Sequence, residues 1–159
     1  MLFRSEEAIW RKEDELKQFY MAAIQDKNLE WWQQDITQMN QKIKANKIKD
    51  ETLMYQRTLD YLSLVFYMQS TGMMKQNNIT GAEYYLKMYV LVDPTNKEAH
   101  YLIADVNALK GNTKEAISSL NKAVDNGFKD LPRIQSDTNF NAIKASKEFQ
   151  EIVMKIDGL

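Results

Sequence analysis

The sequence predicts an all-α protein made of consecutive helices, and three observations lead to this fold class. Apolar residues recur along the chain at the three- and four-residue spacing of amphipathic helices, and no stretch is convincing as a strand. Pro94, Gly111 and Gly127 stand where helical patterns end, as expected for residues that stop a helix or turn left-handed after it. Residues of similar type also recur 34 positions apart around the stretch Gly81–Gly127.

The composition restricts the function classes. The 159 residues suit one domain, and 44% hydrophobic residues can form a sizeable core. A formal net charge of −1, from 21 basic and 22 acidic residues, argues against a nucleic-acid partner. The absence of cysteine excludes disulfides, thiolate zinc sites and thiol catalysis. No apolar run is long enough for a membrane span, and the first residues lack the apolar core of a signal peptide.

Three helices are predicted in the first half of the chain. The first begins at Ser5, whose hydroxyl suits an N-cap, and ends near Asn28. The second covers about 29–45. The third begins at Asp50, another N-cap residue, and ends near Met74; it is apolar on more than one side, so we expect neighbours on two sides. The apolar stripe of the second helix consists of Trp32, Ile36, Met39 and Ile43.

Shorter helices follow in the second half. We expect Thr80 to cap a helix that Pro94 ends, and two further helices over about 97–110 and 113–126. A short helix and a final helix over about 146–156 complete the chain. The sequence therefore predicts six or seven full-length helices and one short one.

Five residue pairs in the central part of the chain are separated by 34 positions. One complete helix-turn-helix unit of this length would cover Lys97–Asp130, and the unit before it about Ser63–Asn96. Alanine at matching positions lets two helices approach closely where they cross. The pairs are Ala82 and Ala116, Leu86 and Leu120, Phe66 and His100, Ser70 and Ala104, and Asn77 and Gly111.

This pattern resembles the tetratricopeptide repeat (TPR), whose units have this length. The resemblance covers roughly Ser63 to the C-terminus. It implies an α-α superhelix of about two helical hairpins, in which the first helix of each hairpin lines a concave groove.

The text GFKDLPRIQSDTNFNAIKASKEFQEIV, which starts at Gly127, resembles the tail that closes many bacterial TPR proteins. Asp137, Phe140 and Ile143 match its turn, and the last helix would cap the stack. The resemblance thus divides the chain into an N-terminal helical extension packed on the repeats (1–62), two TPR-like units (63–130) and a C-terminal capping segment (131–159), within one compact domain.

A search for catalytic chemistry yields no candidate. His100 is the only histidine, and we expect it to have a packing role. The consecutive acids Glu13, Asp14 and Glu15 point in different directions on a helix, so they are expected on a solvated face. Glycine-rich phosphate loops and hydrolase motifs are missing from the sequence. We therefore expect no enzyme activity, no cofactor and no metal.

The resemblance implies a non-catalytic scaffold that binds a peptide or protein partner through a concave groove. We expect the Tyr67 and Tyr101 side chains to be exposed there. TPR domains that clamp a terminal carboxylate carry Lys and Asn where this chain has Tyr67, Thr71, Tyr101 and Asp105, so its acidic residues favour a neutral or basic partner. The expected groove residues are Leu64, Tyr67, Thr71, Met74, Glu98, Tyr101, Asp105, Ala108 and Leu109.

Two alternatives stay open. The chain could be a structural or homo-oligomerising module, in which residues 5–45 fill the groove or pair with another copy. An exposed Trp31 would then be a contact for a partner. The chain could also be a helper domain of a larger bacterial envelope protein, since similar tails close multidomain bacterial proteins. The sequence leaves both the cytoplasm and the cell envelope open as its location.

Overall fold

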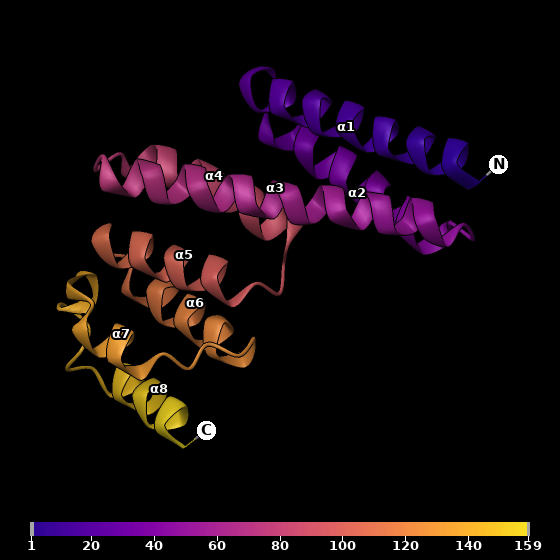
Figure 1. The fold of residues 1–159 in the computed structure, drawn as a ribbon. Helices are drawn as coiled ribbons and strands as arrows, with labels where there is room; N and C mark the ends of the chain where they lie inside the picture. Colours follow the sequence, from indigo (N-terminus) through magenta and orange to yellow (C-terminus); the bar gives the residue numbers. More distant parts are fainter. Residues whose placement is uncertain (1, 159) are drawn as a thin grey trace.

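The computed structural model describes residues 2–158, with side chains from Ser5 onward, and over this range all regular structure is helical (Figure 1). The predicted all-α class is confirmed. Met1 and Leu159, the outer limits of the predicted segments, lie outside the described residues. The elements are α1 (Leu2–Asp26), α2 (Leu29–Ala45), α3 (Lys49–Lys75), α4 (Ile79–Val92), α5 (Lys97–Leu109), α6 (Thr113–Asp125), α7 (Leu131–Ser136), the 3₁₀ helix η1 (Thr138–Phe140) and α8 (Lys147–Asp157).

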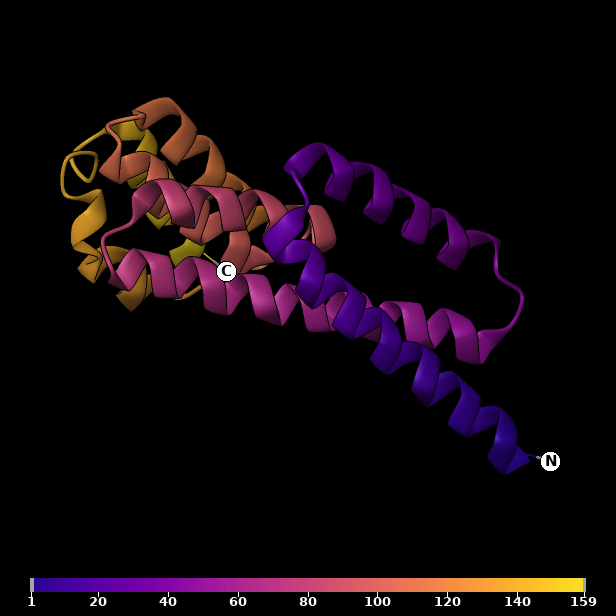
Figure 2. The same ribbon diagram turned by 90° about the horizontal axis from the view of Figure 1, so that it is seen from above.

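The helices form layers in chain order. Helices α3 and α4 pack along each other, and so do α5 and α6. Figure 1 shows α1 and α2 at one end of the molecule, and α7 and α8 at the other. Because α3 has 27 residues and α4 only 14, the first half of α3 extends past α4. Figure 2 shows α1 crossing α3 obliquely, and the two helices are in contact.

The buried core consists of two clusters that meet at α5. The first surrounds Trp32 and Phe66 and extends over α1 to α4, while the second surrounds Phe140 and joins α6 to α8. Helix α5 contributes Leu102 to the first cluster and Tyr101 to the second. It is therefore packed on opposite sides, and this position decides which of its side chains remain accessible.

Several residues 34 positions apart have the same structural role. Ala82 and Ala116 are both fully buried within their hairpins. Asn77 and Gly111 both have positive φ, at 58° and 76°, in the turns after α3 and α5. Glycine adopts this left-handed conformation most readily, and asparagine is the next most favourable residue type. Both turns can therefore close a helical hairpin in the same way.

The beginnings of three helices differ from the prediction. Helix α1 starts before Ser5, which therefore does not cap it. Asp50 lies in the first turn of α3, where its charge favours the helix dipole, and not at the N-cap. Thr80 lies inside α4, because Asn78 is the N-cap and its Oδ1 accepts a hydrogen bond from the Gly81 N–H at 2.9 Å. Helix signals in a sequence identify such ends only to within a few residues.

Glu13 is buried, so its predicted place on a solvated face is wrong. Its carboxylate accepts hydrogen bonds from Arg57 at 2.6 and 3.0 Å and from Lys17 at 2.9 Å. The bond from Arg57 is the main reason that the pKa of Glu13 lies below its usual value. The ion pair attaches α1 to α3. Asp14 and Glu15 are exposed, as predicted.

No helix within residues 2–158 combines the length and the apolar character needed to cross a membrane.

Candidate binding cleft

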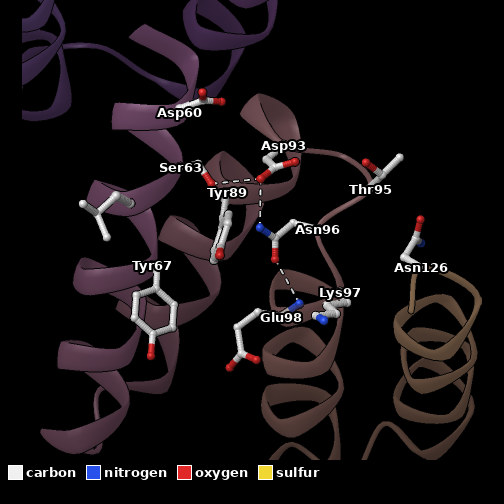
Figure 3. Close-up of a pocket in the computed structure, with 11 residues that line it drawn as sticks. Asp60, Ser63, Tyr67, Tyr89, Asp93, Thr95, Asn96, Lys97, Glu98 and Asn126 are labelled. Atoms are coloured by element: carbon white, nitrogen blue, oxygen red, sulfur yellow. Dashed lines mark hydrogen bonds between the residues drawn. The ribbon is translucent and has the colours of Figure 1, made fainter. Parts of the chain in front are cut away.

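A cleft of about 730 Å³ opens between the second half of α3 and the beginning of α5 (Figure 3). Its walls are the α3 and α5 side chains, and a residue of α4 lies between them. The 93–96 connection and Asn126, directly after α6, supply the remaining lining residues. The lining residues are Asp60, Ser63, Leu64, Tyr67, Tyr89, Asp93, Thr95, Asn96, Lys97, Glu98 and Asn126.

A hydrogen-bond network holds the walls of the cleft together. The Asp93 carboxylate accepts from Ser63 Oγ at 3.0 Å and from Asn96 Nδ2 at 2.8 Å (Figure 3). Asn96 is the N-cap of α5, and its Oδ1 accepts from the backbone N–H groups of Glu98 and Ala99 at 2.9 and 3.1 Å. Asp93, at the end of α4, is thus joined by hydrogen bonds both to α3 and to the N-cap residue of α5.

Aromatic and apolar side chains form the other part of the lining. The Tyr67 and Tyr89 rings lie edge to face with centroids 6.3 Å apart. Tyr89 is only 4% exposed, and burial is the main reason that its pKa is raised to about 12. Tyr67 and Leu64 are 37% and 56% exposed. The cleft therefore presents apolar surface beside phenol groups that can form hydrogen bonds.

The cleft is more acidic than basic. Asp60, Asp93 and Glu98 line it together with a single basic residue, Lys97. The Glu98 carboxylate is already paired with Arg133 through two hydrogen bonds of 2.7 and 2.8 Å. This leaves Asp60 and Asp93 as acids whose hydrogen bonds come from uncharged side chains.

Three of the nine predicted groove residues, Leu64, Tyr67 and Glu98, come together in this cleft. Thr71 and Met74 lie farther along α3 and are not among its lining residues. Thr71 donates its hydroxyl proton to the Tyr67 carbonyl at 2.8 Å, and Met74 packs partly buried against the first core cluster.

Tyr101 is fully buried, so its predicted exposure is wrong. The Phe128 ring stacks on it at a centroid distance of 4.5 Å, and the Arg133 guanidinium lies 4.1 Å from its centroid. Its hydroxyl donates to Asp137 at 2.7 Å. The C-terminal segment covers the face of α5 that the sequence assigned to the groove, so the chain itself occupies that face.

Asp105 is also buried beneath this segment and is only 4% exposed. Burial raises its pKa to about 8, and the neighbouring Asp137 adds to the shift. Asn139 Nδ2 lies 3.4 Å from its Oδ1. Of the remaining predicted residues, Ala108 packs partly buried against the second core cluster, while Leu109 is 47% exposed at the end of α5.

Sequence reasoning missed most of the polar lining of the cleft. The Asp93-Pro94 pair indicates the end of a helix, and nothing more was predicted for it or for Asn96. An asparagine directly before Lys97-Glu98 is a recognisable cap signal. Nothing in the sequence indicates that Ser63 bonds to Asp93, because this contact depends on how α3 lies beside α4.

His100 is partly buried, and its Nε2 lies 2.8 Å from the Pro94 carbonyl oxygen, so the ring is held by the preceding turn. Within residues 2–158, no group of three Asp, Glu or His side chains is placed to hold a metal ion. What the cleft offers is apolar contact, hydrogen bonds and negative charge. No family model, curated protein or solved structure matches this chain.

Proposed function

We propose that this chain is a non-catalytic scaffold of the TPR type, and that it binds a peptide or protein segment in the cleft between α3 and α5. One observation carries the proposal. Leu64 and Tyr67 expose apolar surface inside a cleft whose walls are held together by the network of Asp93 and Asn96. An exposed aromatic on a rigid helix is a favourable anchor for a partner, because little side-chain entropy is lost on binding.

The equivalence of the two hairpins supports the TPR assignment. Ala82 and Ala116 are buried at matching crossings, and Asn77 and Gly111 have matching left-handed turns. In a stack of such units, the first helices line the concave face. Helices α3 and α5 hold that place here, and the cleft lies between them.

The lining favours a peptide over a small metabolite. A peptide carries backbone donors and acceptors that match the hydroxyl groups of Tyr67 and Thr95, together with side chains that can cover Leu64. Within the described residues, α1 and α2 contribute nothing to the lining, so the N-terminal helices leave the cleft open.

A selection from a library of random dodecapeptides displayed on phage tests this proposal. Peptides are selected on the whole chain and then sorted by their loss of binding to the double variant Leu64→Ser, Tyr67→Ala. The matched control is Leu53→Ser, another exposed leucine of α3 that lies outside the cleft. We expect peptides that bind the wild type and Leu53→Ser with equal affinity and bind the double variant much more weakly.

The binding site is then located by ¹⁵N NMR. Peptide addition should shift the amide signals of the second half of α3 and the beginning of α5. If the selected peptides bind the double variant as well as the wild type, or shift only other helices, the cleft is not the binding site and the proposal is wrong.

A second candidate function is self-association through the N-terminal helices. Trp10 on α1 is 63% exposed and lies beside Leu53, which is 44% exposed, around a smaller hollow. Large exposed apolar residues of this kind favour an interface between copies. Sedimentation equilibrium over a range of concentrations would show a dimer that Trp10→Ser dissociates. A monomer at all concentrations excludes this candidate.

A further inference from the structure

We propose that the partner segment carries an arginine, and that its guanidinium stacks on the Tyr67 ring inside the acidic cleft. This inference rests on the proposed function and names the chemistry of the partner. It is drawn from a contact that the chain already makes with itself, one hairpin farther along.

The internal contact consists of an arginine held on a tyrosine of α5. The Arg133 guanidinium lies 4.1 Å from the Tyr101 ring centroid, and its two terminal nitrogens donate to the Glu98 carboxylate at 2.8 and 2.7 Å. Ring stacking and carboxylate pairing together bind a planar guanidinium more tightly than an ammonium group. An ammonium group has no flat face and cannot donate two parallel hydrogen bonds.

Tyr67 is the counterpart of Tyr101, 34 positions earlier, on the corresponding helix. Its surroundings differ in two respects. Leu64 stands three residues before Tyr67, where Glu98 stands before Tyr101. Tyr101 is covered by Phe128 and Arg133, whereas within residues 2–158 the ring pair that Tyr67 forms is the edge-to-face one with Tyr89, and Tyr67 is 37% exposed. The chain supplies a stacking group for one tyrosine and leaves the equivalent ring open.

The charges around Tyr67 match a cation. Asp60 and Asp93 line the same cleft, and within residues 2–158 neither forms an ion pair with a Lys or Arg side chain. Their hydrogen bonds come from the neutral side chains of Gln56, Ser63 and Asn96. The Glu98 carboxylate at the opposite wall is already paired with Arg133 and adds little net charge. A guanidinium near Tyr67 would therefore enter a region of favourable potential.

Two versions of the display library separate this inference from the proposed function. One version contains all amino acids, and the other lacks Arg and Lys. We expect the complete library to yield peptides that depend on the cleft and are enriched in Arg. The library without Arg and Lys should yield far fewer such peptides. If both versions yield such binders equally, the proposed function holds and the arginine inference is wrong. If neither yields any, both are overturned.

A synthetic peptide from the complete library then tests the stacking contact directly. Replacing its enriched arginine by citrulline keeps the shape and removes the charge. We expect this change to weaken binding to the wild type by about three- to thirtyfold. With Tyr67→Leu the same change should weaken binding clearly less, since the aromatic face is gone. Equal factors in the two proteins would contradict the stacking.

The acidic lining is tested with two matched charge changes. Asp60→Asn removes an acid inside the cleft, and Asp14→Asn removes an exposed acid on α1. We expect only Asp60→Asn to weaken the arginine peptide, and the difference to shrink at high salt. Equal weakening by both variants would mean that the net charge of the protein, and not the cleft, attracts the peptide.

Discussion

Tyr67 and Tyr101 hold equivalent places in two successive hairpins, yet one ring is open and the other is fully buried. The helices that carry them are similar in their turns and crossings. The difference arises from the segment that comes after each hairpin. After α6 the chain turns back, and Phe128, Arg133 and Asp137 cover Tyr101. Within residues 2–158 no segment returns in this way over Tyr67, so the same residue type becomes core in one place and surface in the other.

The polar residues beside the two tyrosines also differ in burial. Thr71, beside Tyr67, is partly exposed and bonds to its own helix backbone. Asp105, its counterpart beside Tyr101, is buried against Asp137 and has its pKa raised to about 8. Burial and the neighbouring Asp137 both favour the protonated form of Asp105, so the closing segment shifts the protonation equilibrium of this residue.

The largest expected effect is the difference between the two tyrosine truncations. Tyr101→Ala should lower the free energy of unfolding by about 3 to 5 kcal/mol, because it leaves a cavity under Phe128. Tyr67→Ala should cost less than about 1 kcal/mol, since its ring is partly exposed. Urea unfolding followed by circular dichroism measures both. Equal losses would mean that the two positions do not differ as described.

The second effect concerns pH. The folded-state pKa of Asp105 is about 8, above the unfolded value of about 3.9, so the folded chain binds an extra proton between these values. The free energy of unfolding should therefore fall as pH rises through this window, by on the order of a few kcal/mol in total, and level off above pH 8. The charged and polar groups around Asp105 are Asp137, Arg133 and Asn139.

Urea titrations at several pH values measure this slope. Asp105→Asn, which resembles the protonated acid, should remove most of the slope, while Thr71→Ala at the equivalent position should keep it. Glu13 acts in the opposite direction, because its pKa is lowered: its contribution is lost only when the pH falls below about 4.5. A slope that is unchanged in Asp105→Asn would show that other groups cause it.

The third effect should be the same in both hairpins. Ala82→Leu and Ala116→Leu each insert a larger side chain at a fully buried crossing, and each should cost about 1 to 3 kcal/mol through overpacking. Thermal unfolding compares them with Ala22→Leu on the exposed side of α1, which should be nearly neutral. A large loss in one hairpin and none in the other would show that the two crossings are not equivalent.

The smallest effect separates two helix caps. Asn78 bonds to the Gly81 N–H with its side chain, whereas Asn112, its counterpart, makes no such bond to α6. Asn78→Ala should therefore cost about 1 kcal/mol, and Asn112→Ala only a few tenths. Equilibrium unfolding in urea resolves the difference if both variants are measured in parallel. The opposite order would contradict the capping geometry.

The sequence predicted most of the helices because their signals are local. Amphipathic spacing, together with Pro94, Gly111 and Gly127, located the helical hairpins within a few residues of their observed ends. The cleft was predicted only in part: Leu64, Tyr67 and Glu98 were found, while Ser63, Tyr89 and Asn96 were missed. Each missed residue acts through a neighbour on another helix, and helical periodicity carries no information about such contacts.

What the sequence alone determined is the helical fold class, the 34-residue spacing and the positions of the turns. These depend on backbone preferences and on side-chain spacing within a few residues. Only the tertiary structure decided that Tyr101 and Asp105 are buried, that Glu13 is part of an internal ion pair, and that Tyr67 is open. Burial depends on which distant segment packs over a helix face, and this packing is determined by contacts throughout the chain.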